Sequence, residues 1–186
     1  MTRSRAAVLA ATTALVQERG VAGTSIEAVA QRAGVAKTTI YRQWPDQAAL
    51  VRDALAGSLR EHPVPDTGTV RDDLLELTRG LARALESGPA AGLMLSLLDA
   101  AERDAGFREV HRDEATARHR VVTDVVRRAV DRGDLPPGTD PATVLDLLAG
   151  PLFHRRWFGR SPLDDEFCVA VVDAALAQAN RAVDAG

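Results

Sequence analysis

Residues 20–51, with the sequence GVAGTSIEAVAQRAGVAKTTIYRQWPDQAALV, decide how the N-terminal part of the chain folds. Gly20 ends a first amphipathic helix, and Thr24 with Glu27 forms a capping-box pattern that predicts the start of a second helix. Gly34 ends this second helix, because glycine readily adopts a left-handed backbone conformation. Two short helices joined at such a glycine, with another helix before them, have the dimensions of a helix-turn-helix.

The helix that follows Gly34 is short and polar. It begins near Lys37 and is stopped by Pro45, and an isolated helix of this length is not stable in water. Its polar outer face has two explanations. The helix enters the major groove of DNA, or its polar side chains merely face water on a surface helix. The side chains concerned are Lys37, Thr38, Thr39, Tyr41, Arg42 and Gln43.

This stretch resembles the DNA-binding domain of TetR-type transcriptional regulators. The resemblance is carried by Gly20 and Gly23, Thr24-Ser25-Ile26, Ala33-Gly34-Val35, Ile40-Tyr41 and Trp44-Pro45. The later helices resemble the family only in number, length and order. The chain departs from the pattern at Gln47, where the family usually has a lysine, so a phosphate contact at this position would be weaker.

The resemblance implies which residues face DNA. Arg42 and Lys37 have the donors to bind guanine or phosphate, while the helix start at Thr24 and Ser25 offers backbone N–H groups to a phosphate. Arg5 would add a mobile backbone contact. The expected DNA-binding residues are Arg5, Thr24, Ser25, Lys37, Thr38, Thr39, Tyr41, Arg42 and Gln47.

The distribution of charge agrees with a polyanionic partner for the N-terminal part only. Residues 1–60 carry eight basic and four acidic side chains, whereas the whole chain has a net charge of −3. Residues 61–186 therefore carry a net negative charge. A basic segment on an acidic body is weak support for nucleic-acid binding when taken alone.

Composition narrows the class of protein. The 186 residues are 46% hydrophobic and 26% charged, as in ordinary globular domains, which excludes a disordered or collagen-like chain. No apolar stretch reaches the ~20 residues of a membrane span, and no secretory signal is recognisable. The single cysteine, Cys168, fits a reducing compartment. We therefore expect a cytoplasmic protein without membrane contact.

The periodicity of apolar residues predicts an all-α fold of about nine helices. The segment 61–68 contains two prolines and a glycine and has no periodicity, so it is the best candidate for a domain boundary. We expect a helix-turn-helix DNA-binding domain over residues 1–60. A helical ligand-binding and dimerisation domain over residues 61–186 would follow, with helices near 70–87, 91–101, 104–132, 141–158 and 163–183.

Two further sites are expected in the C-terminal part. Its last two helices are apolar on more faces than one core can cover, and by resemblance they pair with a second copy through Val144, Leu148, Val172 and Leu176. An effector pocket for an apolar small molecule would lie between inward helix faces, although ordinary core packing explains the same residues. The candidate pocket residues are Leu77, Leu81, Met94, Leu97, Leu98, Phe107, His111, Phe153, His154 and Trp157.

Catalysis, cofactors and metals find little support in the sequence. His111 and His119 are eight residues apart and form no metal-binding pair, so a solvated helix face is the better interpretation. No nucleophile, phosphate-loop or dinucleotide motif is present. The sequence predicts a non-enzymatic regulator, most simply a repressor that binds a palindromic double-stranded DNA operator as a homodimer. A helical binding module without DNA affinity is the alternative, and a helical enzyme is a distant third.

Overall fold

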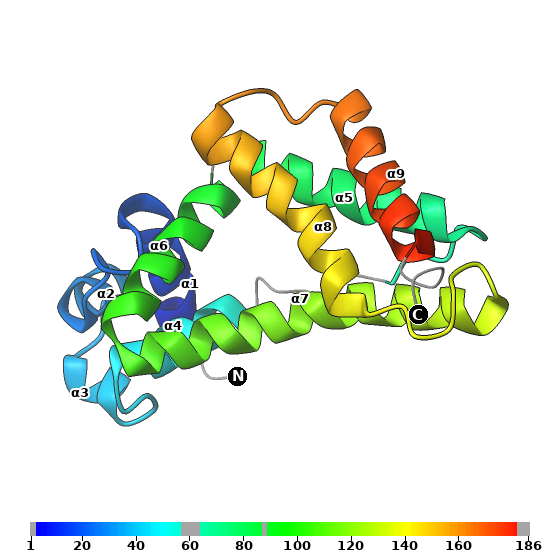
Figure 1. The fold of residues 1–186 in the computed structure, drawn as a ribbon. Coiled ribbons are helices and arrows are strands. Elements are labelled where there is room, and N and C mark those ends of the chain that lie inside the picture. Colours follow the sequence, from blue (N-terminus) through cyan, green and yellow to red (C-terminus); the bar gives the residue numbers. More distant parts are fainter. Residues whose placement is uncertain (1–2, 57–63, 87–88, 182–186) are drawn as a thin grey trace. The chain divides into compact units, whose positions relative to one another are not determined.

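The computed structural model describes residues 3–56, 64–86 and 89–181, and this part of the chain is all-α, as predicted. It contains no strand (Figure 1). The helices are α1 (Arg3–Arg19), α2 (Ile26–Ala33), α3 (Lys37–Tyr41), α4 (Gln47–Ala56), α5 (Val70–Glu86), α6 (Pro89–Arg103), α7 (Ala105–Arg132), α8 (Pro141–His154), the π-helical segment η1 (Arg155–Gly159) and α9 (Asp165–Arg181).

The chain folds into two compact units. Unit 1 consists of Met1–Glu61 and Pro89–Ala115, and unit 2 consists of His62–Gly88 and Thr116–Gly186. We call the helices α1–α4 the head. Within unit 1, the helix α6 and the first part of α7 pack with this head. The first three residues of the predicted linker, 61–63, lie outside the described residues, and residues 64–68 are described. The division into functional domains at residue 60 remains a prediction.

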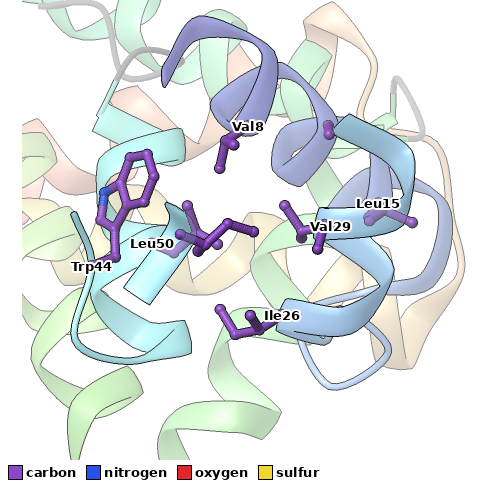
Figure 2. Packing of buried hydrophobic residues seen from close by; sticks show 9 residues of the cluster. Val8, Leu15, Ile26, Val29, Trp44 and Leu50 are labelled. Atoms are coloured by element: carbon purple, nitrogen blue, oxygen red, sulfur yellow. The ribbon is translucent and has the colours of Figure 1, made fainter. Parts of the chain in front are cut away.

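The head is built on a cluster of aliphatic side chains with one indole. Val8 and Leu15 of α1 meet Ile26 and Val29 of α2, while Trp44 and Leu50 close the opposite side (Figure 2). All six are less than 9% exposed. This burial explains how three helices of ten residues or fewer stay folded, since their own propensity would not hold them.

Local signals set the ends of the head helices. Gly20 and Gly34 follow α1 and α2 with φ of 73° and 66°, a left-handed conformation that a side chain would strain. The start of α2 differs by one residue from the prediction. Ser25 is the N-cap, and its hydroxyl accepts the N–H of Ala28 at 3.1 Å. The Thr24 hydroxyl instead donates to the carbonyl of Gly20, because Thr24 is buried against the end of α1.

Unit 2 is built on α5, α8 and α9, which pack against one another. Asp140 caps α8 and Pro141 occupies its first turn, as the sequence predicts. The helix continues through Pro151 and widens into the π-helical segment η1. A proline removes one backbone donor, and a π-segment is one way in which a helix accommodates irregular hydrogen bonding.

Candidate DNA-binding surface

The helix α3 presents most of its polar side chains to solvent. Tyr41 is 52% exposed although it is aromatic. Thr39 is half-buried, while the exposed residues at this surface are Lys37, Thr38, Tyr41, Arg42 and Gln43. The structure therefore places four of the five predicted contacts on α3 and its C-cap in the open, and they lie within one turn and a half of helix.

The opposite side of α3 is anchored in the head. Ile40 is fully buried, and Trp44, which follows the helix, is 4% exposed. The Trp44 indole Nε1 donates to Asp53 Oδ2 at 2.8 Å, and Arg5 Nη2 donates to the same oxygen at 2.5 Å. The Arg5 guanidinium also lies 5.7 Å from the centre of the indole ring. Asp53 on α4 thus holds Trp44, which lies three residues after the last residue of α3.

Three of the predicted DNA contacts are engaged within the head. Arg5 is paired with Asp53, and Thr24 is 1% exposed. The Gln47 Nε2 donates to the backbone carbonyls of Val21, at 3.1 Å, and Thr24. Gln47 therefore ties the start of α4 to the segment between α1 and α2. In the unbound protein it serves as an internal hydrogen-bond donor, a role that the sequence did not reveal.

A carboxylate lies beside the first residue of α3. Lys37 Nζ is 2.8 Å from Glu27 Oε1, and both side chains are more than half exposed. The hydrogen bond to Lys37 lowers the pKa of Glu27, and the same bond raises the pKa of Lys37. Both groups are therefore charged at neutral pH. This pair reduces the net positive charge near the N-terminus of α3, while Arg42 keeps its guanidinium exposed.

Sequence reasoning missed Glu27 and Asp53 as determinants of this surface. The sequence pattern places Glu27 in a capping box, and Asp53 enters only as one of the four acidic side chains of residues 1–60. Their partners Lys37 and Arg5 lie 10 and 48 residues away in the sequence. Only the packing of the helices brings such residues together, so no local pattern could have found them.

The predicted effector-pocket residues are divided between the two units. Leu97 and Phe107 are buried in a cluster of unit 1 that includes Val16 and Val51. In unit 2, the rings of Phe153 and Trp157 stack with their centres 5.3 Å apart. Of the remaining six, Leu98 and His154 are exposed, whereas Leu77, Leu81, Met94 and His111 are half-buried.

The predicted dimer residues lie deeper than expected. Val144, Leu148 and Val172 are at most 4% exposed within the single chain, and Leu176 is half-buried. The expectation that Val144, Leu148 and Val172 face a second copy therefore needs correction, because side chains already buried in unit 2 have almost no area left to contribute. A contact made by α8 and α9 would have to use their exposed faces.

The described residues offer no metal site, no exposed cysteine and no helix that could cross a membrane. Among the described residues, no group of three histidine, cysteine or acidic side chains could hold a metal ion. Cys168 is 1% exposed, and burial raises the pKa of its thiol. None of the described helices combines the length and the apolar character that a membrane crossing requires.

Comparison with known proteins assigns both parts of the chain. Residues 8–54 match the family model of bacterial regulatory proteins of the tetR family, and residues 64–175 match the tetracyclin repressor-like C-terminal domain. An uncharacterised HTH-type transcriptional regulator of Mycobacterium tuberculosis is 33% identical over 91% of this chain and 84% of its own length. A DNA-binding transcriptional repressor TetR of Mycobacteroides abscessus is 33% identical over 94% of this chain and 92% of its own.

Solved structures agree in fold. The TetR family transcription regulator SCO0332 has a TM-score of 0.72 at 32% identity, covering 95% of this chain and 98% of its own. The multidrug binding protein EbrR, solved with proflavin, has a TM-score of 0.67 at 21% identity and covers 93% and 99%, a likeness that concerns the fold alone. The helix-turn-helix surface, both family models and these relatives lead to one conclusion: the chain belongs to the TetR family of bacterial transcription regulators.

Proposed function

We propose that this regulator is a ligand-responsive repressor that binds a palindromic operator as a homodimer. Residues 1–60 would form its DNA-binding domain, and residues 61–186 would bind the ligand and the second copy. The observation that carries the DNA-binding part is the surface of α3, where four exposed polar side chains stand on a helix anchored by Ile40 and Trp44. Such a rigid polar ridge suits the major groove.

The residues on this surface divide into two roles. Arg42 can donate two hydrogen bonds to the O6 and N7 of guanine, which is the commonest contact that reads a base. Thr38 and Tyr41 have hydroxyls for phosphate oxygens and carbon atoms for a thymine methyl group. Lys37 would bind a phosphate after exchanging its bond to Glu27. We therefore assign sequence reading chiefly to Arg42 and positioning chiefly to Lys37 and Tyr41.

The repressor assignment draws on the Mycobacteroides abscessus relative, which is named a transcriptional repressor. Ligand response draws on the fold shared with EbrR, whose structure contains proflavin. The effector would be an apolar molecule that contacts the half-buried Phe153 and Trp157. To release the operator, it must bind better to a state in which the two heads are no longer about one DNA turn, 34–36 Å, apart.

A mobility-shift experiment with the DNA upstream of the gene tests the proposal. We expect specific binding that survives an excess of unrelated DNA and weakens steeply between about 50 and 200 mM salt, because phosphate contacts release counterions. Planar aromatic compounds, both uncharged ones and the cationic dye proflavin, are the first ligands to test; one that binds should change the tryptophan fluorescence and release the DNA at the same concentrations. Binding to no tested DNA, or to all DNA equally, would favour a helical binding module over a sequence-specific repressor.

A further inference from the structure

Lys37 is the only lysine in the sequence. Of the 23 basic side chains, the other 22 are arginines. A guanidinium stays protonated in proteins, because its pKa lies above about 12, and it is therefore a poor nucleophile. A lysine can lose its proton, and the free amine attacks activated acyl groups. The chain thus has a single side-chain amine, and it stands on the first residue of α3.

The surroundings of Lys37 leave this amine open to a reagent or to an enzyme. The side chain is 53% exposed, and that of its partner Glu27 is 62% exposed. The turn before α3 contains the exposed residues Gly34 and Ala36. A Cβ atom added to Gly34 would meet no other atom within 4 Å, so no neighbouring group covers this turn. The amine can be reached while the head stays folded.

An acyl group on Lys37 would change the charge of Glu27's surroundings as well as its own. Lys37 Nζ lies 2.8 Å from Glu27 Oε1, and Glu27 has no other ion-pair partner within the described residues. An amide carries no positive charge, so acylation removes the ion pair. The two side chains then change from a neutral pair to a net charge of about −1. The carboxylate of Glu27 would remain exposed beside α3 without a cation.

We propose that Lys37 is an acylation site that releases the regulator from DNA, with an acyl thioester as the donor. The proposal rests on the DNA binding proposed above, in which Lys37 meets a phosphate. In the reaction the deprotonated Nζ attacks the thioester carbonyl carbon, an N–C bond forms and the C–S bond breaks. The products are a neutral amide and a thiol, and one proton passes to the solvent. The head then presents an uncompensated carboxylate to the DNA backbone.

A phosphate contact alone does not account for a lysine at this position. Arginine binds phosphate with two parallel hydrogen bonds and keeps its charge under all conditions, and the chain uses it everywhere else. Lysine adds a property that arginine lacks, because its charge can be removed by acylation and restored by deacylation. Position 37 combines this property with a place on the reading helix.

A homogeneous protein with Nε-acetyl-lysine incorporated at position 37 tests the effect on DNA. Its operator dissociation constant should rise at least about tenfold, because each copy loses one phosphate contact and exposes one carboxylate. The slope of the salt dependence should fall by about one for each copy. Adding Glu27→Gln should recover part of the affinity, since it removes the bare carboxylate. Thermal unfolding should stay unchanged, because the pair is exposed.

Incubation with acetyl-coenzyme A tests whether the amine reacts, with peptide mass spectrometry as the readout. Wild type should become acetylated at Lys37 and lose operator binding in proportion, whereas Lys37→Arg should keep its binding after the same treatment. Operator DNA should slow the reaction at Lys37, and unrelated DNA should not. Glu27→Gln should react faster than wild type, because the bond to Glu27 raises the pKa of Lys37 and keeps the amine protonated.

The outcomes separate this proposal from the proposed function. Acetyl-Lys37 protein that binds operator as tightly as wild type overturns the switch and leaves the repressor standing. The site is also wrong if Lys37 stays unmodified under conditions that acetylate a free peptide of residues 30–44. Unmodified wild type that binds no operator overturns the proposed function, and the switch with it. An equal loss of binding in acetyl-coenzyme A-treated Lys37→Arg assigns the effect to another group and overturns the role of Lys37.

Discussion

The buried carboxylate Asp73 of unit 2 differs in its environment from the surface ion pairs of the head, and also from surface pairs of unit 2 such as Arg71–Asp173. In the head, the pairs Arg32–Glu18 and Lys37–Glu27 lie on the surface, with side-chain exposures of 41–62%. In unit 2, Asp73 at the start of α5 is fully buried and pairs with Arg128 of α7 at 2.9 Å. Exposed pairs contribute about 0–1 kcal/mol to stability, whereas a broken buried pair costs several times more.

This difference teaches which charges serve folding and which are available to a partner. The head is held by its aliphatic cluster, so its surface charges can exchange partners when DNA arrives without loss of the fold. Asp73 has no such freedom. Its carboxylate also accepts the backbone N–H of Thr67 at 2.6 Å and the Thr67 hydroxyl at 2.7 Å. Asp73 thereby fastens the segment that precedes α5 to α7.

Replacement of Asp73 should have the largest effect. We expect Asp73→Ala to lower the free energy of unfolding by about 3 kcal/mol, because Arg128 and the Thr67 N–H lose their buried acceptor. Urea denaturation measures the change. Asp72→Ala, one residue away on the exposed side of α5, is the control and should cost less than about 1 kcal/mol. Equal losses in both variants would remove the contrast between buried and exposed charge.

The dependence of the free energy of unfolding on acid pH provides a second test of Asp73. Burial alone would raise the pKa of Asp73, but the Thr67 N–H, its hydroxyl and Arg128 together hold this pKa below its usual value. The stabilisation is therefore fully present above an ordinary aspartate pKa of about 3.9 and is lost as the pH falls through the folded-state pKa. Between about pH 5 and pH 2, wild type should lose stability more steeply than Asp73→Asn. Parallel curves would contradict this assignment.

In the head, substitution of exposed residues of α3 and its C-cap should weaken operator binding and leave the free energy of unfolding unchanged. Arg42→Ala or Tyr41→Ala should weaken operator binding by about 1–3 kcal/mol, because both side chains are exposed in the unbound protein and would meet DNA. Fluorescence anisotropy with labelled operator measures the affinity, and thermal unfolding should stay within a degree or two of wild type. If both variants bound operator as tightly as wild type, α3 would not be the reading helix.

The smallest effect is expected at the carboxylate beside α3. Glu27→Gln removes a negative charge next to Lys37, so operator binding should tighten about two- to fivefold and its salt dependence should become steeper. Glu18→Gln is the matched control, since Glu18 pairs with Arg32 and not with a residue of α3. Binding that weakens in Glu27→Gln would mean that the pair orients Lys37 for DNA.

The sequence by itself determined the helices in the described part of this protein and the exposed polar face of α3. Gly20, Gly34 and Asp140 act on backbone groups a few residues away, so their effect on helix ends is visible in the chain as written. Buried and exposed positions on α3 also follow the helical repeat. Both features depend on residues that lie three or four positions apart in the sequence.

Only the tertiary structure decided which polar and apolar residues remain available to a partner. Arg5 and Gln47 carry donors suited to phosphate, yet they bind Asp53 and two backbone carbonyls of the head. Val172 belongs to an apolar helix face that suits a dimer, yet it is fully buried within one chain. Such contacts join residues far apart in sequence, and their formation depends on how whole helices pack. No local pattern contains that geometry.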